Sequence, residues 1–341
     1  MTELHAVHGA IGSVENVPSA ESALIPLVFS RCTALQVEHP LRSEMAASYK
    51  ETWFANQLLV HQVRPMLLAM TELGARPIVL KGGALLSSAY HGDLGARPCF
   101  DIDVLIDPAS VDSVLQLSER EGWSLSSPRS LEEVRRFHHA ADLVKGSHGA
   151  VDVHWELLAH DRSPQRTALL FERTVPATLD TIDVRILEPT WLLFHCLAHS
   201  KPEGFRHLAD ALTILGQHQE SIDWVAIVNE AMDRRELAAT EHQLRAVAEV
   251  RPDMVPTWVL DQLASAKHHW TDYVFAGTVV TSRRSGVKRM AADLAGRTRG
   301  ADPMVKLRAG RILVRKYVDE SGVSLKQKVI SFATKGPTGK R

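Results

Sequence analysis

Two aspartates separated by one residue stand in an apolar stretch and are the first candidates for chemistry. Asp101 and Asp103 belong to Cys99-Phe-Asp-Ile-Asp-Val-Leu-Ile106, a pattern that predicts a strand. Residues two apart on a strand share a face, so both carboxylates should project to the same side. Two ionised carboxylates side by side repel each other unless one takes up a proton or a cation lies between them. Such a pair suits Mg²⁺, which completes its coordination with water and phosphate oxygens.

A glycine pair precedes these aspartates. Pro77-Ile-Val-Leu-Lys-Gly-Gly83 predicts a short buried strand, Pro77 to Leu80, that runs into the glycines. A helix is expected to open at Ala84. Glycines let the backbone approach a phosphate closely, and a helix N-terminus offers unpaired N–H groups and a positive dipole end. We therefore expect Gly82 and Gly83 to hold a triphosphate.

Two basic residues stand close to these motifs. Lys81 and Arg97 are candidates for binding phosphate charge, although Lys81 at a strand end could equally point to solvent. A Gly-Gly alone is most often a turn, and a D-x-D alone is usually a solvated edge or loop. The two in this order, both on apolar strands, are more specific and indicate metal-assisted phosphoryl or nucleotidyl transfer.

These motifs also resemble a known family. The signature of the nucleotidyltransferase superfamily with a polymerase-β-like catalytic domain is similar to Leu80-Lys-Gly-Gly83, Tyr90, Arg97 and Asp101-Ile-Asp103. The closest resemblance is to its branch of largely uncharacterised bacterial nucleotidyltransferases, and it spans roughly Pro77 to Leu215. It implies an α+β fold in which a small mixed β-sheet with flanking helices is followed by a C-terminal helical lobe. It also implies a nucleoside triphosphate as donor and two Mg²⁺ ions.

The superfamily needs a third carboxylate on a neighbouring strand. The segment Ala150-Val-Asp-Val-His-Trp-Glu-Leu157 alternates cleanly, so Asp152 and His154 share a face. With Ala140–Lys145 it predicts a hairpin across Gly146-Ser-His-Gly149, which could place the Asp152 strand beside the Asp101 strand. A rival third carboxylate stands on the same hairpin at Asp142, but Asp152 matches the family segment.

The resemblance implies a role for each of these residues. Asp101 and Asp103 are expected to be metal ligands, with Asp103 bridging the two ions. Asp152 is expected to bind the metal on the nucleophile side and to orient or deprotonate the acceptor. For His154, an orienting or acceptor contact and a hydrogen-bonded core histidine are both open interpretations.

A second resemblance segment, Leu192-Leu-Phe-His-Cys-Leu-Ala-His199, places His195 and His199 one turn apart on a predicted helix. As a zinc pair they lack the glutamate of H-E-x-x-H and a third ligand at suitable spacing. Hydrogen-bonded histidines in a helical interface fit better. They could also face the cleft with Arg206 and Asp210 and bind nucleotide or acceptor.

Composition fits a soluble cytoplasmic protein. Hydrophobic residues make up 45% and charged residues 23% of the 341 residues, which is ordinary for a globular chain. No apolar run is long enough for a transmembrane helix, and the N-terminus does not resemble a secretory signal. The three cysteines, Cys32, Cys99 and Cys196, are scattered in apolar contexts and predict reduced core thiols.

The chain divides into five expected segments. They are a flexible lead-in (1–20), N-terminal helices (21–75), a nucleotidyltransferase catalytic domain (76–188), a helical lobe (189–280) and a basic C-terminal helical tail (281–341). Helical periodicity runs from Ala20 to Leu73, with a kink or break expected at Pro65 and a stop at Gly74.

Further expectations concern the second half of the catalytic domain. We expect a helix from Asp107 to about Glu121, a loop around Ser124 to Glu133, a helix from Arg166 to Ala177 and a strand from Asp183 to Leu187. From Pro189 onward the patterns are almost all helical.

The basic tail leaves the class of acceptor open. From Arg283 onward there are 16 Lys or Arg and 4 Asp or Glu, although the whole chain has a formal net charge of −1. The leading hypothesis is an acceptor that is a small molecule, a peptide product or a protein. The alternative is RNA, such as a tRNA end, bound through the tail. A third hypothesis, an inactive nucleotide-binding regulatory module, is disfavoured because all three carboxylates are present.

Overall fold

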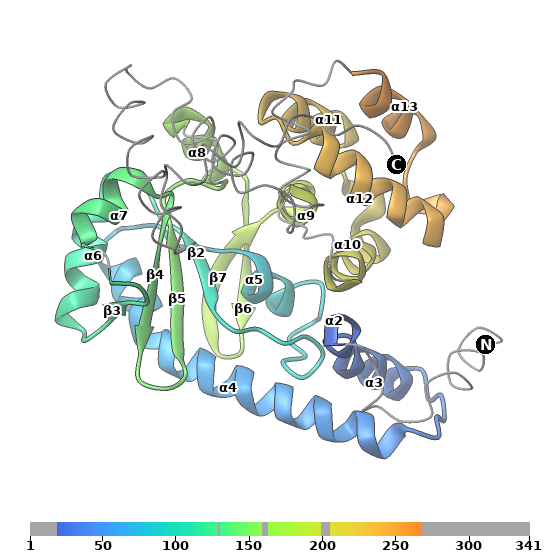
Figure 1. The fold of residues 1–341 in the computed structure, drawn as a ribbon, viewed down its shortest axis with the longest axis horizontal. Coiled ribbons are helices and arrows are strands. Elements are labelled where there is room, and N and C mark those ends of the chain that lie inside the picture. Colours follow the sequence, from blue (N-terminus) through green and yellow to red (C-terminus); the bar gives the residue numbers. More distant parts are fainter. Residues whose placement is uncertain (1–18, 129, 159–162, 199–204, 267–341) are drawn as a thin grey trace, which may run out of the picture.

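The computed structural model describes residues 19–128, 130–158, 163–198 and 205–266. A mixed sheet lies at its centre (Figure 1). Its strands are β1 (Ile78–Val79), β2 (Ile102–Leu105), β3 (Ser124–Leu125), β4 (Ala140–Lys145), β5 (Gly149–His154), β6 (Thr174–Leu179) and β7 (Ile182–Leu187). Their order is β3-β4-β5-β2-β1-β7-β6. The pairs β2–β5 and β1–β7 are parallel and the other pairs are antiparallel. Every residue of the central strand β2 is buried, as expected for a strand covered on both faces.

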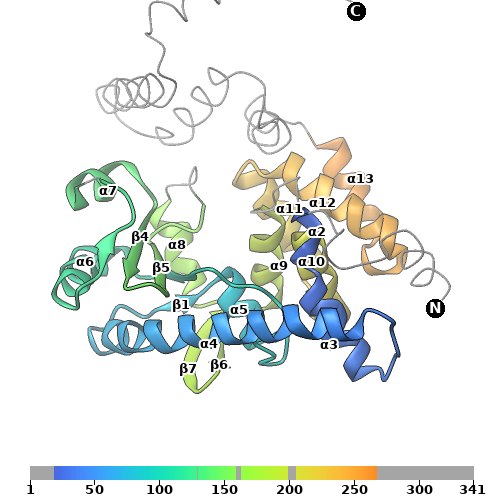
Figure 2. The same cartoon turned by 60° about the horizontal axis from the view of Figure 1, so that its bottom comes forward.

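The N-terminal helices are α2 (Ser19–Ser22), α3 (Ile25–Ala34) and α4 (Arg42–Glu72). Figure 2 shows α4 running along the sheet, with α3 at one end of it; α4 packs against α3, β5 and β2. The expected break at Pro65 is wrong, because α4 continues through it. A proline removes one helical hydrogen bond, but apolar residues on both sides of it, such as Val63 and Met66, are buried and hold the helix in place. The expected stop is confirmed, since Gly74 follows the helix with φ +77°.

A short helix, α5 (Lys81–Ser87), follows β1 directly. It begins three residues earlier than expected, so the opening at Ala84 is wrong. Leu80 is still extended, and its carbonyl accepts the Ala84 N–H at 3.1 Å. Gly82 and Gly83 therefore lie in the first turn of a helix, and both are buried.

The hairpin of β4 and β5 is confirmed, and its turn begins at Gly146 with φ +61°. The expected helix after Asp107 is also present, as a 3₁₀ turn (Pro108–Ser110) and α6 (Val111–Arg120). The segment expected to be a loop contains β3 at its start and the first turn of α7 (Leu131–Phe137) at its end, so that expectation holds only for the residues between them. Ser130 caps α7 by accepting the Glu133 N–H.

The expected helix from Arg166 to Ala177 is wrong in its second half. Helix α8 (Pro164–Leu170) ends early, and β6 begins at Thr174. β6 pairs with β7 along its whole length and lies at the sheet edge, where Pro176 is tolerated. Pairing across the sheet outweighs the helical periodicity of the segment.

Up to residue 266, where the described part of the chain ends, five helices follow the sheet. They are α9 (Pro189–Ala198), α10 (Phe205–His218), α11 (Trp224–Asp233), α12 (Leu237–Val250) and α13 (Thr257–Ser265), with 3₁₀ turns at Gln219–Ser221 and Pro252–Met254. They lie side by side next to the sheet (Figure 1), and α9 contacts β7, α5 and α10. This arrangement confirms the α+β class with a helical lobe. The basic tail from Arg283 and the rest of the expected lobe lie outside the described residues.

The three cysteines are unpaired; Cys32 and Cys99 are buried, as expected of core thiols, whereas Cys196 is only partly buried. None of the described helices is long and apolar enough to cross a membrane.

Candidate active site

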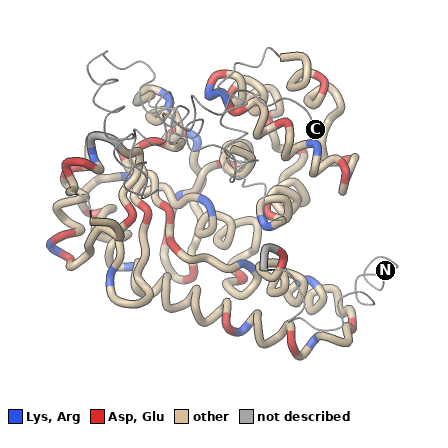
Figure 3. Tube along the Cα trace, in the orientation of Figure 1, with Lys and Arg blue, Asp and Glu red and all other residues tan. Residues whose placement is uncertain are grey.

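Three carboxylates form a row across three neighbouring strands. Asp103 on β2 is paired in register with Asp152 on β5, and Asp152 is paired with Asp142 on β4. Residues directly opposite one another on paired strands project from the same face. Figure 3 shows acidic positions gathered on these strands. The expectation that the Asp152 strand lies beside the Asp101 strand is confirmed, and Asp142, its rival, extends the same row.

Two basic groups lie against this row. The Lys81 ammonium forms an ion pair with Asp103 Oδ1. His154 Nε2 lies 3.2 Å from Asp103 Oδ1 and 2.8 Å from Asp152 Oδ2, so one imidazole N–H faces both carboxylates. The Lys81 backbone has φ +42°, a left-handed conformation that residues other than glycine rarely adopt. Such strain persists where surrounding structure enforces it and is frequent at functional sites.

The charges of this cluster depend on one another. Burial alone would lower the pKa of His154, but Asp152 and Asp103 outweigh it and raise the pKa to about 9, which leaves the imidazole protonated at neutral pH. Burial opposes the ionisation of Asp103, but the hydrogen bond from His154 and the charge of Lys81 hold its pKa below the usual value. Burial and the neighbouring Asp152 raise the pKa of Asp142 to about 6. The site therefore keeps ionised carboxylates in a largely buried place.

A cavity lies beside the carboxylates, between the first turn of α5 and the helices α9 and α10. The lining residues that were predicted from the sequence are Lys81, Gly82, Arg97, Asp101, Asp103, His195, Arg206 and Asp210. Asp101 directly precedes β2 and is exposed. The carboxyl is nevertheless partly desolvated by the atoms around the cavity, and this desolvation and the nearby Asp103 raise its pKa. The structure thus brings the D-x-D aspartates and residues of the helical lobe to one cavity.

The donor set fits a hard divalent cation. Ligand atoms of Asp103, Asp152 and His154 all lie within 4.8 Å of one another. Because the His154 imidazole is protonated and faces both carboxylates, the oxygens of Asp103 and Asp152 are the ligands that this cluster offers. Asp152 Oδ1 is buried and has no hydrogen-bond partner among the described residues. Carboxylate oxygens at one face of a sheet are the ligands that Mg²⁺ takes in proteins, so Asp103 and Asp152 can hold it, and Asp101 as a further ligand stays a prediction.

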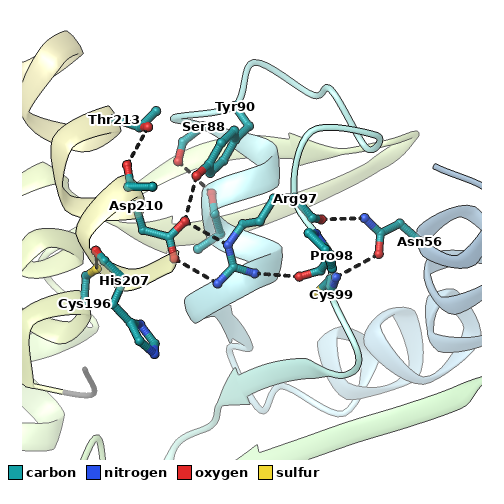
Figure 4. Close-up of polar contacts among 12 residues, drawn as sticks. Asn56, Ser88, Tyr90, Arg97, Pro98, Cys99, Cys196, His207, Asp210 and Thr213 are labelled. Carbon is teal, nitrogen blue, oxygen red and sulfur yellow. Dashed lines mark hydrogen bonds and ion pairs between the residues drawn. The ribbon is translucent and has the colours of Figure 1, made fainter. Parts of the chain in front are cut away.

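Arg97 lines the cavity, but its guanidinium is held by a carboxylate of the helical lobe. Its Nε and Nη2 donate to the two carboxylate oxygens of Asp210 on α10, at 2.9 and 3.0 Å (Figure 4). Tyr90 also donates to Asp210, at 2.7 Å. Arg97 and Asp210 are buried. Burial would lower the pKa of Arg97, but Asp210 outweighs it and raises the pKa. This bidentate pair joins the D-x-D loop to the helical lobe.

The two glycines are required for close packing. A Cβ at Gly82 would lie 2.6 Å from both Arg97 Nη1 and Cys99 Sγ, and a Cβ at Gly83 would lie 2.7 Å from a methyl group of Val79. The first turn of α5 is therefore pressed against β1 and the D-x-D loop. Phosphate binding by these glycines stays a prediction.

The histidines of α9 are only partly described. His195 is buried and lines the cavity, while His199 lies outside the described residues. A second cluster with metal-ligand atoms comprises Cys196, His207 and Asp210. The Asp210 oxygens already accept hydrogen bonds, and burial raises the pKa of the Cys196 thiol, which opposes the thiolate that zinc needs. This second cluster is therefore not a good zinc site.

Two residues near the site were not predicted from the sequence. Asn56, buried within α4, makes three hydrogen bonds to the segment that leads to Asp101. Phe100, next to Asp101, lines the cavity and is 76% exposed. An exposed large aromatic beside a D-x-D could have been noticed, because such residues mark binding surfaces. Asn56 could not, because its partners are distant in the sequence.

Comparison with known proteins agrees with this geometry. The model of a family described as "uncharacterised nucleotidyltransferase" matches residues 19–251, which is more than half of the chain. The chain therefore belongs to this nucleotidyltransferase family. A search of curated proteins found no match.

Proposed function

We propose that this nucleotidyltransferase moves a nucleoside monophosphate from a nucleoside triphosphate to a hydroxyl or phosphate acceptor, with release of pyrophosphate. The acceptor would be a small molecule, a peptide natural product or a protein. The observation that carries the proposal is the pairing of Asp103 with Asp152 across β2 and β5, together with the cavity that Asp101 and Asp103 line.

The carboxylates have distinct tasks in this proposal. Asp101 and Asp103 would hold two Mg²⁺ ions, with Asp103 shared between them, and Asp152 would bind on the side of the attacking group. Bound Mg²⁺ would supply charge for the phosphate oxygens and lower the pKa of the attacking hydroxyl. His154 faces Asp103 and Asp152 together and thereby orients both.

Groups around the cavity would bind the substrates. The Lys81 ammonium lies at the cavity and can neutralise phosphate charge. Arg206 and His195 reach the cavity from α10 and α9 and are candidates for contact with nucleotide or acceptor. The exposed ring of Phe100 offers a flat apolar surface against which a base or an acceptor can stack.

The test is nucleotide transfer by the purified full chain. Each of the four labelled NTPs is incubated with Mg²⁺ and fractions of a cell extract that contain small molecules, RNA or protein, and pyrophosphate release is measured in parallel. We expect transfer by the wild type and a loss of at least about 100-fold in Asp101→Asn, because a metal ligand is removed. Asp112→Asn is the matched control, since Asp112 is an exposed carboxylate on α6.

The labelled fraction identifies the class of acceptor. Label in the RNA fraction, with steep salt dependence, would replace our proposal by the RNA alternative. Full activity in Asp101→Asn would refute the metal site. A wild type that neither transfers label nor binds any NTP with Mg²⁺ would favour the inactive regulatory module.

A further inference from the structure

Asp101 differs from the other predicted metal ligands in how it is held. Asp103 and Asp152 are fixed by Lys81 and His154. The side chain of Asp101 is exposed, and it makes no hydrogen bond or ion pair with the residues that the structure describes. The position of its carboxylate therefore depends on the backbone that precedes β2.

One side of this backbone is held by α4. Asn56 Nδ2 donates to the carbonyl of Leu94 at 2.6 Å. It also donates to the carbonyl of Arg97 at 2.8 Å, and Asn56 Oδ1 accepts the Cys99 N–H at 3.0 Å (Figure 4). The side chain is only 1% exposed, so both amide hydrogens and its oxygen are used in a buried place. The Cys99 thiol then donates to the Asp101 carbonyl at 3.0 Å. A chain of contacts thus runs from α4 to the backbone of Asp101.

The other side is held by the helical lobe. The Arg97 guanidinium binds both oxygens of Asp210 on α10, and its Nη1 donates to the Pro98 carbonyl at 3.2 Å. The guanidinium also packs against Gly82, where no Cβ would fit. The segment from Leu94 to Cys99 is therefore clamped between α4 and α10, immediately before the D-x-D motif.

We propose that Asn56 and Arg97 are positioning residues that jointly place the Asp101 carboxylate beside that of Asp103 for metal binding. Arg97 acts through the segment that carries Asp101 and does not contact phosphate. This inference rests on the proposed function, because it takes Asp101 as a metal ligand. It extends the site to a residue of α4 that lies 41 positions before Arg97 in the sequence.

The test measures Mn²⁺ binding to the full chain without nucleotide, by electron paramagnetic resonance and by calorimetry. The variants are Asn56→Ala, Arg97→Lys and the double variant, with Asp101→Asn as the positive control. Arg97→Lys keeps the charge beside Asp210 but loses the bidentate geometry. If Asn56→Ala does not fold, Asn56→Asp replaces it, because that side chain keeps the shape and the acceptor for the Cys99 N–H. Val247→Ala, at a buried position of α12, is the control for a loss of stability remote from the loop.

We expect each single variant to weaken Mn²⁺ binding about tenfold, as outer-shell partners of metal sites do. The double variant should lose less than the product of the two effects, because both residues hold the same segment. Val247→Ala should bind as the wild type does.

Three results would overturn the proposal. The first is Mn²⁺ affinity within about twofold of wild type in folded Asn56 and Arg97 variants, against the tenfold loss expected for outer-shell partners. The second is an Arg97→Lys variant with unchanged Mn²⁺ binding and weakened NTP binding, which would make Arg97 a phosphate contact. The third is a wild type whose Mn²⁺ binding does not respond to Asp101→Asn; this would refute the metal site of the proposed function, and the positioning role with it.

Discussion

Replacing Asp210 by Asn should destabilise the fold strongly. Asp210 is 0% exposed, and its two oxygens accept three hydrogen bonds, two from Arg97 and one from Tyr90. The side-chain amide introduced by the substitution would point its NH₂ group at an N–H donor of Arg97. The buried guanidinium would also lose its counter-charge. Removing one partner of a buried ion pair costs about 3–5 kcal/mol. That is a large share of the roughly 5–15 kcal/mol by which domains are stable.

The assay is urea unfolding at neutral pH, followed by circular dichroism. Two comparisons isolate the ion pair. Glu172→Gln breaks the exposed pair with Arg76, in which the side chains are 54% and 75% exposed, and should cost less than about 1 kcal/mol. The double variant Arg97→Met/Asp210→Leu removes both charges and should regain much of the lost stability. A loss in Asp210→Asn no larger than in Glu172→Gln would refute the reasoning.

Two further predictions concern packing and pH. Gly82→Ala should cost about 1–3 kcal/mol in urea unfolding, because its Cβ would meet Arg97 and Cys99 at 2.6 Å, whereas Gly216→Ala has no contact closer than 3.9 Å and should be neutral or stabilising. Burial holds the pKa of His195 well below 6.5 in the folded chain, so the unfolded chain takes up this proton first as the pH falls. The free energy of unfolding therefore does not depend on His195 above about pH 6.5, and at lower pH it decreases by at most about 1.4 kcal/mol per pH unit. His195→Gln should lose that part of the slope in unfolding titrations between about pH 7.5 and 5.5, the range around the ordinary histidine pKa; an unchanged slope would contradict the assignment.

Local pattern was sufficient for several elements of this fold. Alternation with period two predicted both strands of the β4–β5 hairpin and the shared face of Asp152 and His154. A left-handed glycine at Gly74 ends α4 as expected. These features depend on neighbours along the chain, so a short stretch of sequence contains the information. Residues 166–177 show the limit, because the strand β6 exists through its pairing with β7.

The sequence by itself determined which residue types this site contains, whereas the tertiary structure decided which of them meet. The D-x-D spacing and the alternation around Asp152 identify the carboxylates, because side-chain direction on a strand follows from local geometry. Strand order and register, which put Asp103 beside Asp152, are set by the packing of the whole sheet. Arg97 was predicted to bind phosphate, which stays a prediction, and in the fold its guanidinium pairs with Asp210, 113 residues away, a contact that no local pattern reports. A buried guanidinium needs a counter-charge wherever the fold brings one close, so only the folded chain shows what Arg97 binds.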